Sequence, residues 1–548
     1  MSPRRAGPFV LLFLACVAAC APVFVLPGWP ENHDRVACFQ RVEIFRRAFA
    51  EGSLLPLWTP LAENGHGSPF PFFYHRLFNT LAGGLALATG STLAGVRAAI
   101  LLLLFAGALG MRRTLRAAGL ASFPATCGAL LFVFSNYAYT DWVVRGAFAE
   151  FAAFMLVPWL FDAALGVVAG RSRAGWALGA VLALLFFAHS VIFLFASGFV
   201  LLAFAGALAF RQGRARALPA LGQAALVVAV VAGPFLAGIR VFGADADLDV
   251  FRSGQFAVFR NFVPFADMLY DRVGGWTSST AGYSVEIGRG FNSLAIVCCA
   301  AVAALAVCRR LPTSRLRETG PAWFLALGAA ALYAVLESPV SAPLYRLAPP
   351  LQFVQFPWRL LTFSTAVSIV LLCLSIDLLA ASSPSAAVRR GLHAALLAAV
   401  LFQVWYGVGR PPPPRLIAAD EIAASLTPAR LSATRHSDAF RPRGAPPPEP
   451  RPLFEPAGCV IREASPRAAL SGLEDVPEIR LAVDSDPDAV LVVHWFASPF
   501  LAVSAGRGGR VETTEGGTIL VRPPPGPSEI VLRRCGLFEA LRTRLFGR

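Results

Sequence analysis

The chain has 548 residues, of which 56% are hydrophobic and 15% are charged, and its formal net charge is +15. A soluble chain of this length carries about a quarter charged residues. Here the apolar residues gather in blocks of about twenty, the length that crosses a bilayer. These figures exclude a soluble enzyme, a disordered regulator and a collagen-like fibre. The basic residues are all arginines, which excludes chemistry that rests on a lysine Schiff base or a P-loop lysine.

The first apolar block follows a short basic segment. Arg4 and Arg5 precede an apolar run over residues 8–26. Basic residues mark the cytoplasmic end of a membrane helix, so we predict a first transmembrane helix with a cytoplasmic N-terminus. A cleaved signal peptide is the alternative, and we favour the helix because the run continues past Cys20.

Ten further apolar segments predict membrane-spanning helices, which makes eleven with the first. They centre on residues 93–110, 121–136, 151–170, 174–189, 191–210, 218–239, 291–308, 321–337, 359–381 and 391–408. A shorter apolar stretch, 78–89, is too short to span, and we expect it to lie in the membrane interface. The sequence therefore predicts an all-α polytopic membrane protein with a small β-domain.

The distribution of arginine tests this topology. With 78–89 on the surface, the predicted cytoplasmic loops contain sixteen arginines and a single acid, Glu318. The arginines are Arg4, Arg5, Arg112, Arg113, Arg116, Arg171, Arg173, Arg211, Arg214, Arg216, Arg309, Arg310, Arg315, Arg317, Arg389 and Arg390. Excess arginine marks cytoplasmic loops. The +15 is therefore a topology signal rather than a nucleic-acid footprint, and we expect a multi-pass membrane protein. The family resemblance described below implies that this membrane is a bacterial inner membrane.

The domain organisation follows from the same reading. We predict a transmembrane domain over residues 1–409, with outer loops at 27–92, 137–150, 240–290 and 338–358, then a Pro-rich linker over 410–456. β-type runs at 479–483, 490–496, 518–521 and 529–532 predict an extracytoplasmic β-rich domain over 457–548. A Cys459–Cys535 disulfide would be compatible with an oxidising compartment, although the spacing does not establish it.

The residue that we single out in the first outer loop is Asp34, which follows His33 just after the first helix. A carboxylate at the outer end of a membrane helix is placed to accept a proton from a hydroxyl or to bind a cation. Asp is equally a favoured helix N-cap, here for an amphipathic helix over residues 35–50. His33 is either a tuning neighbour or simply solvated.

Other candidates lie at the outer membrane boundary. Asp141, Arg145 and Glu150 are ionisable residues in an otherwise apolar loop. Arg145 and Glu150 form either an internal ion pair, or a site where arginine meets a lipid phosphate and an acid meets sugar hydroxyls or a metal. Arg359 at a helix start suggests an anionic ligand, or a snorkelling anchor. His189, in an outer turn, is more typical of packing than of catalysis.

Several short motifs together resemble the GT-C superfamily of integral-membrane glycosyltransferases. Within it they are most similar to the YfhO-like group and to membrane proteins labelled "6-pyruvoyl-tetrahydropterin synthase-related". The motifs are His33-Asp34, the run from Gly52 through Trp58 to Pro60, Gly65-His66-Gly67-Ser68-Pro69 leading to Phe73-Tyr74, Arg145-Gly146-Ala147 with Glu150, Gln355-Phe356-Pro357-Trp358-Arg359, and, more weakly, His494-Trp495-Phe496-Ala497-Ser498-Pro499.

The resemblance implies transfer of a sugar from a polyprenyl-phosphate donor to an extracytoplasmic glycan, lipid or protein. By the same resemblance, Asp34, Asp141 and Glu150 would be the acidic catalytic positions, and Arg145 and Arg359 would lie near the lipid phosphate. His33, Trp58, Tyr74 and His189 would contact substrate, and a divalent Mg or Mn ion is a candidate cofactor. The alternative is a non-enzymatic lipid-linked-glycan translocase or an envelope-assembly scaffold.

Overall fold

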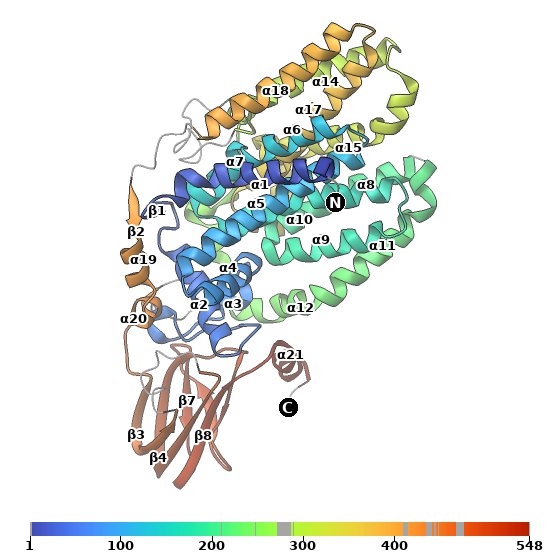
Figure 1. The fold of residues 1–548 in the computed structure, drawn as a ribbon. Coiled ribbons are helices and arrows are strands. Elements are labelled where there is room, and N and C mark those ends of the chain that lie inside the picture. Colours follow the sequence, from blue (N-terminus) through green and yellow to red (C-terminus); the bar gives the residue numbers. More distant parts are fainter. Residues whose placement is uncertain are drawn as a thin grey trace. The chain divides into compact units, whose positions relative to one another are not determined.

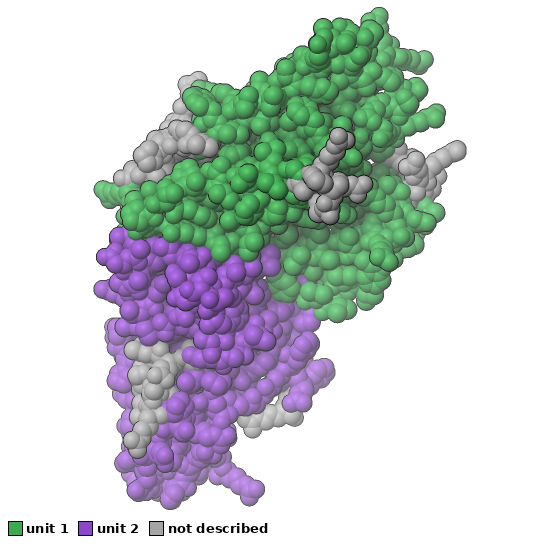
Figure 2. Space-filling view, viewed as in Figure 1, with its two compact units in different colours: residues 1–35, 97–231, 254–417 green, residues 36–96, 232–253, 418–548 purple. Residues whose placement is uncertain are grey.

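The structure is a computed structural model, and it describes residues 3–209, 211–246, 248–270, 286–288, 290–408, 415–434, 441–442, 445, 447, 449–466 and 476–546. The chain divides into two compact units, which Figure 2 colours separately. Unit 1 comprises Met1–Arg35, Arg97–Val231 and Gly254–Ile417. Unit 2 comprises Val36–Val96, Ala232–Ser253 and Ala418–Arg548.

Unit 1 is a bundle of helices, most of which run side by side along similar or opposite directions (Figure 1). Its long helices are α1 (Pro3–Phe24), most of α5 (Thr92–Ala117), α6 (Ser122–Val133), α8 (Phe148–Val168), α9 (Ala174–Ala188), α10 (Ser190–Ala209), α11 (Arg211–Val231), α14 (Asn292–Val307), α15 (Thr313–Glu337), α17 (Leu361–Ser382) and α18 (Ala386–Val408). The most apolar windows of α8 and α17 are 83% and 89% buried, so these two helices form the core. α17 packs against α6, α8, α14, α15 and α18.

Each of the eleven predicted membrane segments contains a helix in the structure. Within the described part of the chain, seven helices are long and apolar enough to cross a membrane, or up to eight if α11 and the following α12 (Gly233–Phe242) form one bent span. α6, α9 and α14 have 12, 15 and 16 residues and are shorter than a full crossing. A multi-pass membrane protein is therefore confirmed, and the count of eleven crossings stays a prediction.

Two acids within the spans of unit 1, Asp162 and Asp377, pair with arginines of the loops that we predict to be cytoplasmic. Asp162 near the end of α8 accepts a 2.7 Å hydrogen bond from Nε of Arg113. Asp377 near the end of α17 is held by Nε and Nη2 of Arg315, each at 2.9 Å. These pairs lie at the opposite ends of α8 and α17 from Glu150 and Arg359.

Unit 2 contains a six-stranded sheet in the order β5-β8-β4-β7-β6, with β3 paired to β4. The strands are β3 (Phe454–Ser465), β4 (Glu478–Phe496), β5 (Leu501–Ser504), β6 (Arg510–Thr513), β7 (Thr518–Arg522) and β8 (Gly526–Arg534). The predicted runs at 479–483 and 490–496 are one strand, β4. A register shift opposite Gly458 shows that the chain bulges between them instead of turning.

The helices of unit 2 are α2 (Ala37–Ala50), α3 (Phe70–Phe73), α4 (Leu77–Thr89), α12, α19 (Ala419–Ser425), α20 (Pro428–Ser432) and α21 (Leu537–Phe546). α4 is the segment expected in the membrane interface, and it packs on α2. α19 and α20 lie within the segment predicted as a linker, which therefore contains local secondary structure in its described part. The predicted domain boundaries otherwise stay a prediction.

The first outer loop packs on the sheet within unit 2. The rings of Trp58 and Trp495 meet edge to face at 4.8 Å between centroids, and those of His66 and Phe496 lie 5.1 Å apart. The backbone N–H of Phe496 also donates to the carbonyl oxygen of His66 at 2.7 Å. Gly67 lets Trp58 approach, because a Cβ there would lie 2.1 Å from the indole. Two motifs distant in the sequence therefore form one packed contact.

Cys459 and Cys535 are free thiols, so the disulfide that the sequence left open is not formed. The sheet register gives the reason. Cys459 of β3 lies opposite Ser485 of β4, whereas Cys535 follows Arg533 of β8, which pairs with Glu478 at the start of β4. Ser485 and Glu478 are seven residues apart along β4, about 23 Å, and a disulfide requires Cα atoms within about 7 Å.

Candidate functional site

The site is built on the segment between α6 and α8 in unit 1. It comprises α7 (Asn136–Tyr139), then a π-helical turn, η2 (Thr140–Arg145), and then Gly146 with φ of 70°. Wide π-turns are rare and occur often at functional sites. Glycine is required at position 146 for two reasons. Its φ is left-handed, and a Cβ there would lie 2.7 Å from the side-chain amide of Asn32.

Four side chains from this segment and the start of α8 form a buried network around Arg145. Nη1 of Arg145 lies 2.7 Å from Oδ1 of Asp141 and 2.9 Å from Oε1 of Glu150, and Nη2 lies 2.9 Å from Oε2 of Glu150. Tyr137 donates its hydroxyl to Glu150 and accepts from Arg145 at 3.3 Å. The predicted internal ion pair between Arg145 and Glu150 is therefore confirmed.

Arg359 adds a second cation to this network. It lies in η9 (Pro357–Leu360), the 3-10 turn before α17, and its Nε is 3.3 Å from Oε2 of Glu150. Its Nη1 donates to the carbonyl oxygen of Val354 and to Oε1 of Gln355, each at 3.1 Å. The anion expected to compensate a cation at this helix start is thus supplied by the protein itself, as Glu150.

The charges of the network are unequal once burial is considered. Asp141 and Glu150 are 0% and 1% exposed. Burial raises the pKa of Asp141 well above its usual range, the Glu150 carboxylate adds to the rise, and Arg145 opposes it. Burial thus disfavours the charged form of Asp141, and Glu150 is the carboxylate that both arginines contact.

Asp34 is held beside this network by backbone hydrogen bonds. The N–H groups of His33 and Asp34 donate to the carbonyl oxygens of Val144 and Arg145, both at 3.2 Å. The structure thus brings the acid of the first outer loop next to the acidic motif of the second. Asp34 is not the N-cap of α2, which begins at Ala37 after Val36 with no side-chain cap.

The backbone is strained at two positions that flank the site. Arg35, directly after Asp34, has φ of 46°, and Gln355, four residues before Arg359, has φ of 64°. Non-glycine residues rarely adopt this region, and such strain tends to cluster at functional sites. Each strained residue is close in sequence to a candidate site residue. Arg35 follows Asp34, and Gln355 precedes Arg359.

The remaining sequence-predicted residues are distributed over both units. The pKa of His33 is lowered, first by desolvation and then by the charge of Arg145, while Asp34 opposes the shift. His189, in unit 1, is 3% exposed at the end of α9. Trp58 and Tyr74 belong to unit 2, where Trp58 also carries the guanidinium of Arg534 over its ring and Tyr74 carries that of Arg41.

Sequence reasoning missed Tyr137, Gln355 and Asn32 as members of the site. Tyr137 lies in the predicted outer loop 137–150 and Gln355 in one of the motifs above. Their residue types did not distinguish a hydrogen-bonding role from an aromatic or amide packing role. Asn32, two residues before Asp34, is 4% exposed, and its contact with Gly146 depends on a tertiary arrangement.

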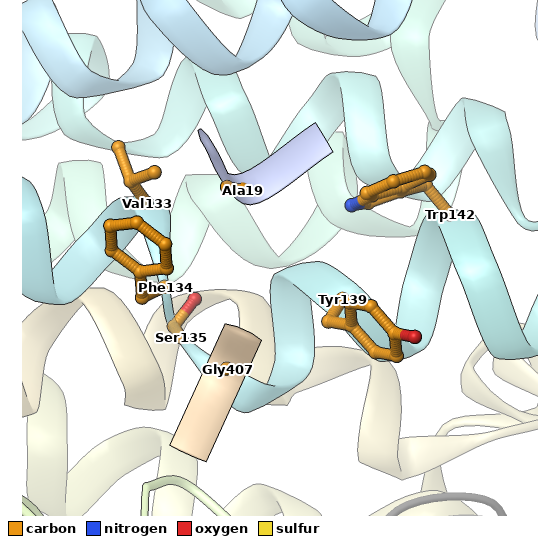
Figure 3. A pocket seen from close by; sticks show the side chains of 7 residues that line it. All are labelled: Ala19, Val133, Phe134, Ser135, Tyr139, Trp142 and Gly407. Atoms are coloured by element: carbon orange, nitrogen blue, oxygen red, sulfur yellow. The ribbon is translucent and has the colours of Figure 1, made fainter. Parts of the chain in front are cut away.

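A shallow cleft lies along the same segment in unit 1. Its lining residues come from α1, the α6–α7 turn, η2 and α18, and they are Ala19, Val133, Phe134, Ser135, Tyr139, Trp142 and Gly407. Figure 3 shows Tyr139 and Trp142 on one side, Val133, Phe134 and Ser135 on the other, and Ala19 and Gly407 between them. Three of the seven lining residues are aromatic, Phe134, Tyr139 and Trp142, and Trp142 directly follows Asp141 of the buried network.

Within the described residues, no group of three or more His, Cys, Asp or Glu side chains lies close enough to hold a metal ion. In the predicted outer loop 240–290, Glu286 is 0% exposed, and Arg289 lies outside the described residues.

Comparison with known proteins gives only distant likenesses. No family model matches the chain, and no curated protein matches it. The solved structures that it resembles include the arabinofuranosyltransferase AftD from Mycobacteria, at 16% identity and a TM-score of 0.40, over 76% of this chain and 28% of that one.

A second resembling structure is the oligosaccharyltransferase of Archaeoglobus fulgidus, at 12% identity and a TM-score of 0.43, over 80% of this chain and 61% of that one. The same enzyme in complex with an inhibitory peptide and a dolichol-phosphate gives 11% identity and a TM-score of 0.38, over 81% of this chain and 61% of that one. The chain thus spans less than two thirds of either protein. Both names denote glycosyltransferases, and at these scores the likeness gives no argument about what this chain does.

Proposed function

We propose that the chain is a membrane glycosyltransferase that moves a sugar from a polyprenyl-phosphate donor to an acceptor hydroxyl outside the cytoplasm. The observation that carries the proposal is the placement of Asp34, by backbone hydrogen bonds, beside a buried network with two arginines. The motifs that resemble GT-C glycosyltransferases supply the reaction class, and the YfhO-like resemblance remains part of the proposal.

The chemistry requires a base for the acceptor and positive charge for the leaving group. In the proposed reaction, a carboxylate oxygen of Asp34 accepts the proton of the acceptor hydroxyl. The oxygen of the acceptor hydroxyl, not that of Asp34, forms a bond to the anomeric carbon of the sugar while the bond from this carbon to the phosphate oxygen breaks, and the polyprenyl phosphate leaves with the electron pair.

Asp34 suits the role of base because it is only partly buried, whereas Asp141 and Glu150 are enclosed. The network around Arg145 then positions the loop, and its two arginines favour a phosphate that gains negative charge as the bond breaks, the more so because burial disfavours the charged form of Asp141. The aromatic side chains of Tyr139 and Trp142 at the neighbouring cleft offer a surface to the nearest isoprene units of the donor (Figure 3).

The translocase alternative has less support from the structure. A path for a charged headgroup through the bundle would place ionisable side chains along the mid-membrane part of the spans. Asp162 and Asp377, the two acids that stand out within the spans, are instead tied to Arg113 and Arg315. Both pairs lie at the helix ends away from the site.

The test is sugar transfer from a labelled polyprenyl-phosphate sugar by the full chain in proteoliposomes. Asp34→Asn keeps the shape of the side chain and removes the base, and we expect transfer to fall by about 100- to 10,000-fold. Glu31→Gln is the matched control. Glu31 is a carboxylate three residues away that pairs with Arg35 at 3.2 Å, and its loss should leave transfer near the wild-type rate.

Equal transfer by Asp34→Asn and the unaltered chain would overturn the assignment of the base. Flipping of a fluorescent lipid, measured in the same vesicles, separates the functions. Flipping without transfer by the unaltered chain would overturn the proposed enzyme in favour of the translocase.

A further inference from the structure

The helix α21 of unit 2 presents an apolar and basic face that no other described element covers. Phe538, Leu545 and Phe546 are 74%, 58% and 82% exposed. Phe538, Arg542 and Leu545 are spaced by four and three residues, which places them on one face of a helix, and Phe546 continues its edge. Single exposed apolar residues are ordinary, but three on one short helix face form a continuous patch.

The opposite face of α21 is held firmly inside unit 2. Leu537 and Ala540 are 4% and 3% exposed. α21 packs on α12, where a Cβ on Gly238 would lie 3.2 Å from Leu537 Cδ1. Arg544 Nη2 lies 3.0 Å from Oδ1 of Asp245, just after α12. The orientation of the apolar face within unit 2 is therefore fixed by contacts on the other side of the helix.

The helix on which α21 packs, α12, indicates what covers the exposed face of α21. α12 follows the apolar helix α11 across a bend of 56°, and the two together are long and apolar enough for one bent membrane span. α21 is thus attached to the part of unit 2 that follows a membrane segment. A lipid surface fits the residue types, because aromatic and leucine side chains enter the headgroup boundary while arginine reaches the phosphates.

We propose that α21 is an interfacial membrane anchor, with Phe538, Leu545 and Phe546 inserted among the lipids of the outer surface and Arg542 at the phosphate level. The anchor would tie unit 2 to the bilayer through α21, next to α12. Arg542 makes the contact stronger on anionic lipid than on zwitterionic lipid.

The test uses the full chain in nanodiscs of zwitterionic lipid, alone or mixed with anionic phosphatidylglycerol. A photo-crosslinking phenylalanine analogue replaces Phe538, and in a second variant Phe546, both exposed enough to leave the fold intact. The control carries the analogue at Val460 of β3, which is 65% exposed. After illumination, the mass of the intact protein reports phospholipid adducts.

We expect adducts at Phe538 and Phe546 at least fivefold above those at Val460, and a several-fold loss in anionic discs when Arg542→Glu is added. Adduct levels equal to the control would overturn the proposal. So would crosslinks from Phe538 to protein, either within the chain or to a second copy, because the face would then have a protein occupant.

Discussion

Replacing Arg145 by methionine tests whether the buried network holds the site together. Arg145 donates to Asp141, Glu150 and Tyr137 through four hydrogen bonds of 2.7–3.3 Å. Its loss leaves Glu150 with Tyr137 and Arg359, and takes from Asp141 the cation that it faces. Removing one partner of a buried ion pair costs about 3–5 kcal/mol. We therefore expect Arg145→Met to lower the free energy of unfolding by that amount.

Two further variants show which of the two acids contributes more to the stability of the network. Glu150→Gln should cost nearly as much as Arg145→Met, because it leaves Arg145 and Arg359 buried with little counter-charge. Asp141→Asn should cost less, about 1 kcal/mol, because burial already raises the pKa of Asp141 and so disfavours its charged form.

The assay is the unfolding midpoint in detergent, followed with a thiol-reactive dye that reports exposure of the buried cysteines. A cost of 3–5 kcal/mol corresponds to a fall on the order of 10 °C. An Asp141→Asn variant as damaged as Arg145→Met would refute the unequal charge of the network. An unchanged midpoint for Arg145→Met would refute the network as a structural element.

Three smaller predictions concern glycines and pH. Gly146→Ala should destabilise unit 1 and reduce sugar transfer more than Gly254→Ala does, because both have positive φ but only the first would clash; midpoints and transfer rates compare the two. Gly65→Ala should destabilise unit 2 by roughly 1–2 kcal/mol of left-handed strain, because the added methyl meets nothing within 4 Å. Gly67→Ala should cost more, because its methyl would also clash with Trp58. Equal unfolding midpoints for the two variants would contradict the packing described. Burial lowers the pKa of His66 below its ordinary value of 6.5. As the pH drops below about 6.5, the unfolded chain therefore binds a proton before the folded chain does, and the stability falls. His66→Gln should flatten this part of the curve of unfolding midpoint against pH.

Much of the helical architecture could be read from hydropathy, because a span must be apolar over its whole length. Each predicted segment contains a helix, and α4 is as short as its sequence indicates. Strand boundaries were less accessible. The Asp486-Pro487-Asp488 stretch is typical of a turn, yet it is a bulge within β4, because pairing with β3 continues on both sides of it.

The site shows the same division. Residue type was enough to select Asp34, Arg145, Glu150 and Arg359 as candidates. Charged side chains at a membrane boundary cost free energy, so those that are present often have a function. The alternatives for each residue stayed open because an ion pair, a cap and a ligand contact use the same side chains. Only the arrangement of the chain showed that Glu150 neutralises Arg359 and that Asp34 does not cap α2.

By itself, the sequence determined that the protein is a multi-pass membrane protein whose chemistry-bearing residues gather at helix ends, because hydropathy and charge act through composition and spacing alone. The tertiary structure decided which of these residues meet. Asp34 and Arg145 are over a hundred positions apart, and they are brought together by two backbone hydrogen bonds and by the missing side chain of Gly146. These hydrogen bonds join backbone N–H and C=O groups, which residues of very different side chains share. The side-chain pattern therefore does not predict the contact between Asp34 and Arg145.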